Sequence, residues 1–217
     1  MLKEIKLLFQ KELILEWRSK FALSGVVLYV FSTIFVSSLI IIHVEKFTWN
    51  ALFWIIMLFS AINAVSKSFL QDSKGRQMYI SGLAGPASIL VAKILYNCCL
   101  MIFLTLIAFS LYTMFFKMQA HDLWMYLITI VLGSITFSTL FTLISAIASK
   151  AGNGGVLMAI LSFPIIIPAL IVLSKLAKNA MDGLDYSANV DEIFTLIIIN
   201  ILAIVFSILL FPYLYRD

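Results

Sequence analysis

The sequence predicts an all-α, polytopic membrane protein with six transmembrane helices. Of its 217 residues, 63% are hydrophobic and only 12% are charged, whereas a soluble domain carries about 25% charged residues. Apolar runs close to the ~20 residues that cross a bilayer recur at roughly 21–43, 49–69, 87–116, 123–148, 154–174 and 193–215. These runs take up nearly the whole chain, so we divide it into an N-terminal segment, 1–20, and a six-helix transmembrane domain, 21–217.

The distribution of basic residues predicts the orientation of these spans. With a cytoplasmic N-terminus, eleven Lys and Arg residues fall inside and only four outside, namely Lys46, Lys117, Lys175 and Lys178. This asymmetry places both termini in the cytoplasm. The net charge of +4 follows this pattern and does not indicate nucleic-acid binding. A cleaved signal peptide is disfavoured, because a charged 20-residue segment precedes the first run and no small-residue cleavage site follows it.

The segment 1–20 is typical of an amphipathic helix on the membrane surface. Apolar residues recur in it at three- and four-residue steps, with basic residues between them. Glu12 and Glu16 fall on the apolar side. Either they pair with basic residues from another loop, or other parts of the protein partly cover the helix, or they are the solvated acids of a surface helix, which is the interpretation we prefer.

Polar residues within the spans suggest helix contacts more than ion transport. The fourth span carries a run of hydroxyls between Ser134 and Ser145, which is typical of helix contacts or cavity lining. Lys93, near the inner end of the third span, is expected to extend to the membrane interface. The middle of every span lacks Asp, Glu, Lys and Arg. Since ion-coupled carriers usually need such groups, any transport would take its energy from a partner.

The longest cytoplasmic connection, residues 71–86, is a candidate docking element for a soluble partner. It starts charged, continues through an apolar and aromatic patch, and ends at the breakers Gly82, Gly85 and Pro86. The alternative is an ordinary surface turn that rests on the membrane, which would leave the apolar patch exposed. The candidate docking residues are Lys74, Arg76, Met78, Tyr79, Ile80 and Leu83.

The fifth span is the least ordinary segment of the chain. It begins at the glycine pair Gly154 and Gly155 and contains Pro164 and Pro168, which share one helix face. Each proline removes a backbone donor and clashes with the preceding turn. In a bilayer the freed carbonyls need neighbouring helices, hydroxyls such as Ser162, or water. We therefore expect a broken helix that serves as a gating element.

The motifs of common enzymes are missing from the sequence. It has no Gly-x-x-x-x-Gly-Lys-Ser/Thr loop, no His-Glu-x-x-His and no Gly-x-Ser-x-Gly, so an enzyme is disfavoured. The adjacent Cys98 and Cys99 point to different sides of a helix and suit packing. The two histidines, His43 and His121, both fall near the external face. They are the only candidate heme ligands, and neither has a second ligand at metal spacing, so no bound cofactor is assigned.

Two segments carry a resemblance to a known family. The glycine pair 154–155 with the Pro-x-x-x-Pro segment 163–171, and the stretch 69–74 with 85–93, resemble the six-helix membrane subunit of ABC-2 type exporters. More narrowly, they are similar to the CcmB-type heme exporter permease of cytochrome c maturation. Glu12 and Arg18 add a match to the family's N-terminal pattern.

The resemblance implies an ABC-2 exporter-like fold in the bacterial inner membrane and a set of partners. These are membrane lipids, an identical permease copy, a separate cytoplasmic ATPase that uses ATP, a CcmC-type heme-handling membrane protein and a heme chaperone. Residues 71–86 would be the coupling helix and heme the candidate substrate. Two alternatives remain open, an ABC-2 permease for another lipid-like or drug-like substrate and a membrane assembly scaffold that does not transport.

Overall fold

A computed structural model confirms the all-α fold. It describes residues 1–18, 21–41, 43–65, 67–70, 79–80, 82–117, 120–150 and 154–214, and these contain helices and no strand. The long helices are α1 (Leu2–Arg18), α2 (Phe21–Ile40), α3 (Lys46–Val65), α6 (Pro86–Phe115), α7 (Leu123–Ala148), α8 (Gly154–Asp182) and α9 (Val190–Leu214). Two short elements, α4 (Lys67–Leu70) and the 3-10 helix η1 (Tyr186–Asn189), lie between them.

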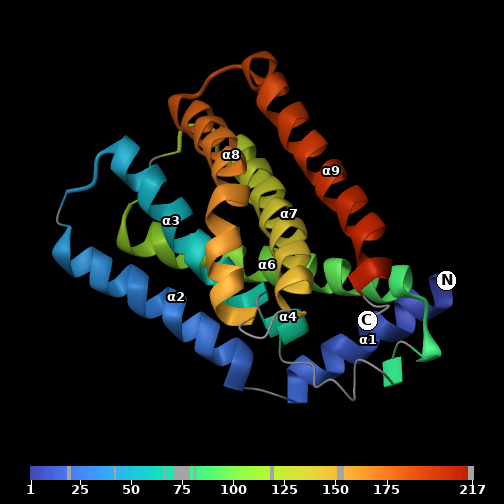
Figure 1. Cartoon of the computed structure of the whole chain (residues 1–217). Coiled ribbons are helices and arrows are strands. Elements are labelled where there is room, and N and C mark those ends of the chain that lie inside the picture. The colour runs from blue at the N-terminus through green and yellow to red at the C-terminus, as the bar shows by residue number, and fades with distance from the viewer. Residues whose placement is uncertain are drawn as a thin grey trace.

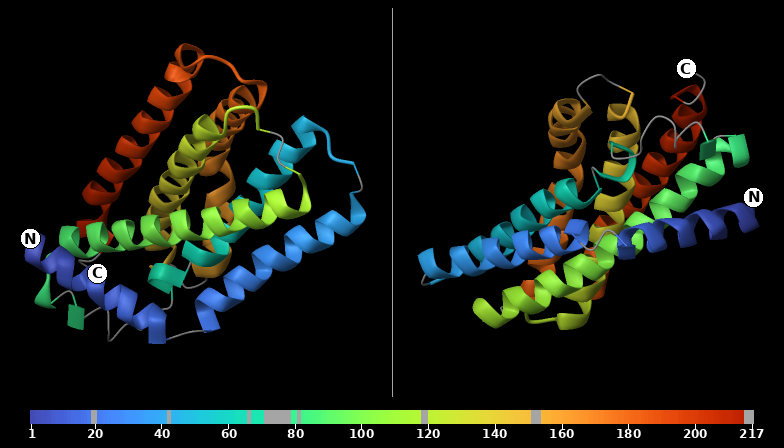
Figure 2. Two further views of the ribbon diagram at one scale, coloured as in Figure 1. Left: turned by 180° about the vertical axis from the view of Figure 1, so that it is seen from behind. Right: turned by 90° about the horizontal axis from the view of Figure 1, so that it is seen from below.

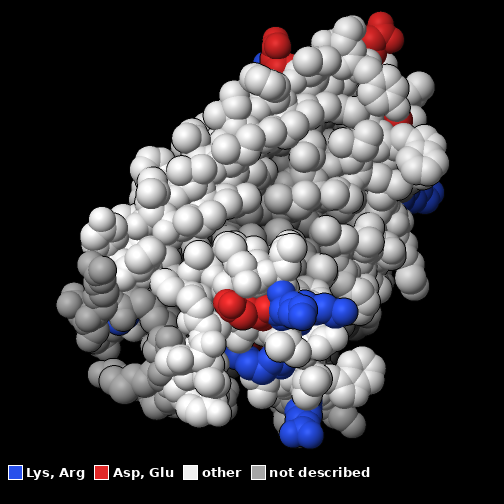
Figure 3. Space-filling view, turned by 90° about the vertical axis from the view of Figure 1, so that its right-hand side faces the viewer, with Lys and Arg blue, Asp and Glu red and all other residues white. Residues whose placement is uncertain are grey.

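Six of these helices, α2, α3, α6, α7, α8 and α9, are long and apolar enough to cross a membrane. On the face shown in Figure 3, most charged side chains lie toward the two ends of the molecule, and a broad, largely uncharged surface separates them. Such a band matches the hydrocarbon core of a bilayer. The six predicted spans are therefore present, and α1 is an additional helix in the N-terminal segment. The placement of α1 on the membrane surface stays a prediction.

Helix α7 lies at the centre of the fold and packs against α3, α4, α6, α8 and α9 (Figure 1). The hydroxyls of α7 make the predicted helix contacts. Ser134 donates to Thr105 of α6 at 2.9 Å, and Thr139 donates to Asn200 of α9 at 2.8 Å. The amide of Asn200 in turn donates to Thr136 at 2.9 Å. Hydroxyls thus join α7 to two neighbouring helices, as expected of small polar residues in membrane bundles.

A close approach of α3 to α7 depends on a glycine. A Cβ atom at Gly133 would lie 2.6 Å from the ring of Trp54, a buried side chain of α3. Only a residue without a side chain allows the indole to sit this near the α7 backbone. The neighbouring buried rings of Trp49, Phe53 and Tyr126 continue the aromatic core beside this contact.

The chain ends and the interhelical connections define two ends of the molecule. The N-terminal helix α1 packs along α6, and the N-terminus and the last turns of α9 lie at the same end of the molecule (Figures 1 and 2). We call this the terminal end. At the opposite end, the amide of Asp122 donates to the carbonyl of Ala180 at 3.1 Å, and Lys46 pairs with Asp182 at 3.7 Å.

Helix α8 differs from its predicted form in two respects. It extends to Asp182, eight residues beyond the predicted end of the fifth span at 174. The helix ends where Gly183 adopts φ +71° and the amide of Leu184 donates back to Asn179 at 3.1 Å, a Schellman ending that favours glycine. The prediction of a broken helix is wrong, because α8 remains continuous across Pro164 and Pro168.

Candidate functional site: a polar junction at the terminal end

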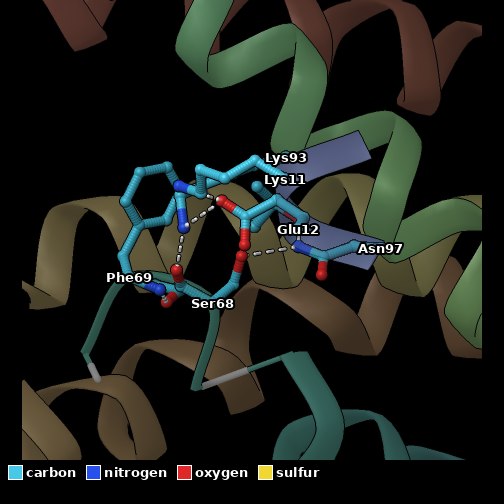
Figure 4. A network of polar contacts seen from close by, with 8 residues as sticks. Lys11, Glu12, Ser68, Phe69, Lys93 and Asn97 are labelled. Atoms are coloured by element: carbon cyan, nitrogen blue, oxygen red, sulfur yellow. Dashed lines mark hydrogen bonds and ion pairs between the residues drawn. The ribbon is translucent and has the colours of Figure 1, made fainter. Parts of the chain in front are cut away.

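A buried lysine forms the centre of the candidate site. Lys93 lies in the second turn of α6, and its side chain is only 4% exposed. The expectation that it extends to the membrane interface is wrong, since the side chain turns into the protein toward α1 and α4 (Figure 4). A buried ammonium group is stable only with close electrostatic partners, so its surroundings define the site.

Three groups from two other helices surround the Lys93 ammonium. Glu12 of α1 places Oε1 3.4 Å from Lys93 Nζ, and Nζ also donates to the carbonyl oxygen of Ser68 in α4. The ring of Phe69 lies 4.6 Å from the same nitrogen in cation–π geometry. Lys93 therefore holds α1 and α4 against α6 through a single charged group.

Glu12 is more enclosed than a surface acid. Its side chain is 14% exposed and accepts from Lys11 at 2.9 Å as well as from Lys93. The interpretation of Glu12 as a solvated acid is therefore wrong. The alternative of a basic partner is confirmed, but this partner is Lys93 of helix α6 and not a residue of another loop. The imperfect amphipathicity of α1 has its cause here, because an acid on the apolar side can pair with a lysine from α6.

A second set of hydrogen bonds fixes α4 to α6 and α7. Asn97, one turn beyond Lys93, donates to Ser68 Oγ at 3.1 Å and to Thr142 Oγ1 of α7 at 2.8 Å. The backbone amide of Phe69 donates to Ser145 Oγ, also of α7, at 3.4 Å. The start of the 71–86 connection is thus tied to two membrane helices. We call Glu12, Ser68, Phe69, Lys93, Asn97, Thr142 and Ser145 the junction.

An apolar layer extends the junction to the end of the connection. Phe69 packs against Phe211 of α9 with ring centroids 5.5 Å apart, within a cluster that also includes Leu8 of α1 and Ile80 and Ala84 of the connection. The amide of Ala84 donates to the carbonyl of Ile80 at 3.0 Å, as in a helical turn. A displacement of this turn would therefore press on side chains that contact α1, α6 and α9.

The comparison with known proteins accords with this architecture. A family model described as CcmB protein matches residues 3–210. The chain belongs to the CcmB family. A search of curated proteins found no match. The family and the six apolar helices make the chain a multi-pass protein of the bacterial inner membrane. Its members are the membrane permease component, not an enzyme, of a heme-exporting ABC system in cytochrome c maturation.

The coupling residues predicted for this CcmB-family chain lie in different surroundings. Tyr79 and Leu83 are 70% and 67% exposed, whereas Ile80 between them packs into the apolar layer. The remaining three, Lys74, Arg76 and Met78, lie outside the described residues. Two exposed apolar side chains and one inward side chain on a short turn suit an element that contacts a partner outside and the bundle inside. The coupling role of all six stays a prediction.

Three of the four predicted gating residues of α8 face outward. Gly155, Pro164 and Pro168 are exposed and Gly154 is half-buried. The Ser162 hydroxyl donates to Met158 O at 2.6 Å. It therefore does not donate to the carbonyl of Ile160, which lacks its helical donor because residue 164 is a proline. The gating role remains a prediction, and the carbonyls freed by the prolines lie on an outward face.

The candidate heme ligands give no assembled site. His43 and His121 are both exposed, and the ring of His121 lies against Gly183 at the end of α8. Within the described part of the chain, no three His, Cys, Asp or Glu side chains gather as a metal site. A heme role for either histidine stays a prediction.

Sequence reasoning missed the junction as a unit. Lys93 and Asn97 are four residues apart and share a face of an otherwise apolar helix, which is the pattern that could have indicated a buried polar contact. Glu12 on the apolar side of α1 was the complementary feature. Ser68 contributes its hydroxyl to Asn97 and its backbone carbonyl to Lys93, and the carbonyl contact has no counterpart in the sequence pattern.

Proposed function

We propose that this chain is the permease subunit through which ATP hydrolysis on a separate cytoplasmic subunit drives heme export or the release of a heme-loaded chaperone. Membership of the CcmB family supports this proposal. So does the sequence, which lacks a phosphate-binding Gly-x-x-x-x-Gly-Lys-Ser/Thr loop. The ATPase would contact the 71–86 connection, and the heme chaperone and a CcmC-type protein would act with the permease.

The observation that carries the proposal is the attachment of both ends of this connection to one site. Its start follows Ser68 and Phe69, which contact Lys93 and Ser145, and its end packs through Ile80 on the layer around Phe69. A force on the exposed Tyr79 and Leu83 would pass through these contacts to α6 and α7. A movement of the connection would therefore be transmitted through the junction to the membrane helices.

The proposed orientation and stoichiometry follow from charge and from α8. Eleven basic residues against four favour cytoplasmic termini, which puts the junction on the side of the ATPase. The outward face of α8 holds Pro164 and Pro168, whose freed carbonyls need partners inside a bilayer. A second copy of the permease packed on this face would supply them, in agreement with a homodimer.

The coupling proposal can be tested with a matched pair of double variants. Tyr79→Ala with Leu83→Ala removes the exposed side chains of the connection, whereas Tyr186→Ala with Leu184→Ala removes the same residue types at the opposite end, where they are also exposed. The first pair should abolish co-purification of the ATPase and formation of c-type cytochromes, while the control pair should retain both.

The outcomes also separate the alternatives. Unchanged ATPase binding in the Tyr79 and Leu83 variant would overturn the docking assignment. Normal c-type cytochromes in a deletion strain with altered lipid or drug export would favour another ABC-2 substrate. Failure of the unmodified protein to bind any ATPase would favour an assembly scaffold.

A further inference from the structure

A cavity at the opposite end of the molecule lies outside the junction and the coupling connection. It has a volume of about 510 Å³ and lies between the start of α3 and the last turns of α8, within the range of small-molecule sites. Basic, amide and apolar side chains line it together. Those that carry the argument are Lys46, Asn50, Leu170, Ser174, Lys175 and Lys178.

The lining residues are arranged by depth. Lys178, Ser174 and Leu170 follow one another at four-residue steps on α8, and Lys46 and Asn50 do so on α3, so each set stacks along one helix face. Positive charges therefore lie at the outer rim, amide and hydroxyl groups one turn deeper, and aliphatic side chains deeper still. This is the order of groups in an anionic lipid, from phosphate to glycerol to acyl chain.

The side-chain carbonyl oxygen of a buried asparagine beside this cavity accepts no hydrogen bond. Asn50 is only 3% exposed, and its Nδ2 donates to the carbonyl of Ser174 at 2.9 Å. Its Oδ1 accepts no hydrogen bond, although a buried acceptor without a partner is costly. This oxygen is itself closed to the cavity, so Asn50 holds α3 against α8 through its bond to Ser174 and does not contact a ligand.

The rim retains one lysine that is not neutralised. Lys46 pairs with Asp182 at 3.7 Å, and Lys175 pairs with Glu192 at 2.6 Å. Among the described residues, Lys178 makes no ion pair. The cavity therefore presents a free positive charge beside two paired ones, which favours an anionic head group over a zwitterionic one.

We propose that this cavity binds an anionic glycerophospholipid such as phosphatidylglycerol. The phosphate lies at Lys178, the glycerol backbone lies at the depth of Ser174, and one acyl chain runs along Leu170 toward the bilayer. The apolar depth of the cavity distinguishes this ligand from a soluble phosphate, which would leave the aliphatic wall uncovered. The proposal does not depend on the transported substrate.

The test uses the full chain in phosphatidylcholine nanodiscs with a small fraction of phosphatidylglycerol. Native mass spectrometry counts the lipids retained by the unmodified protein, by Lys178→Glu and by the matched control Lys117→Glu. Lys117 is an exposed lysine at the end of α6 that does not line the cavity. We expect Lys178→Glu to lower phosphatidylglycerol retention at least about fivefold, the equivalent of ~1 kcal/mol per basic residue, and Lys117→Glu to leave it unchanged.

Two further probes need no variant that could misfold. Phosphatidylmethanol carries the same charge and acyl chains without a head-group hydroxyl, so it should be retained as well as phosphatidylglycerol. Glycerol 3-phosphate should not compete. Markedly weaker retention of phosphatidylmethanol, competition by glycerol 3-phosphate, or an equal effect of the two lysine variants would overturn the proposal.

Discussion

A double-mutant cycle on Glu12 and Lys93 tests the junction at its most buried contact. Glu12→Gln removes the carboxylate and leaves the Lys93 ammonium with Ser68 O and the Phe69 ring. Lys93→Met keeps the length of the side chain and removes its charge, but leaves Glu12 paired with Lys11 at 2.9 Å. The two single variants therefore leave different charges behind.

The expected magnitudes follow from this asymmetry. At 3.4 Å and an effective dielectric constant near 20, the gross attraction is roughly 5 kcal/mol, most of which offsets desolvation. Glu12→Gln leaves the Lys93 ammonium, whose side chain is 4% exposed, without its carboxylate partner. This should lower the free energy of unfolding by about 3 kcal/mol, at the lower end of the range for broken buried pairs. Lys93→Met should cost less, about 1–2 kcal/mol, with a coupling energy of about 1–3 kcal/mol.

The assay is unfolding of the purified chain in detergent, followed by circular dichroism. A loss of 1 kcal/mol lowers Tm by roughly 2–4 °C for a chain of this size, so the two single variants are distinguishable. Lys6→Met, which removes an exposed lysine from the same helix as Glu12, is the control and should leave Tm within about a degree, as surface substitutions do. A coupling energy below about 0.5 kcal/mol, or a smaller effect of Glu12→Gln than of Lys93→Met, would refute this account of the junction.

Two other substitutions test the packing of the bundle. Gly133→Ala places a Cβ 2.6 Å from the Trp54 ring. The overpacking should lower the free energy of unfolding by about 1–3 kcal/mol. A Tm equal to that of the unmodified chain would contradict the close approach of α3 and α7. Replacing Pro164 and Pro168 together with alanine should raise Tm, because each interior proline costs a helix about 3 kcal/mol, while lowering the yield of c-type cytochromes. Full yield would show that the prolines have no part in gating.

The sequence was sufficient to predict the helices, because their main determinant is local. Apolar runs of sufficient length predicted all six spans, and Pro86 marked the start of α6. The apolar run predicts an end of the fifth span at 174, whereas the helix continues to Asp182, before the glycine at 183. A lysine at a helix end does not stop the helix, but a glycine with positive φ does.

The junction could be predicted only in part, because it depends on contacts between distant segments. Glu12 was recognisable as an acid on an apolar face, but its partner is 81 positions away in the chain. Helix periodicity cannot show that α1 covers Lys93. The docking residues are predicted from charge, an apolar patch and helix breakers, and none of these indicates the inward contact of Ile80.

The most direct test of the central claim is the amount of heme-loaded chaperone released per ATP hydrolysed by the complex of this permease, its ATPase and the CcmC-type protein in vesicles. Lys93→Met should leave ATPase binding and ATP hydrolysis near the levels of the unmodified complex. It should lower release per ATP by about tenfold, within the range of typical coupling energies, while Lys6→Met should have no effect. Unchanged release per ATP in Lys93→Met, with the complex intact, would contradict the claim that the junction transmits the motion of the 71–86 connection to the membrane helices.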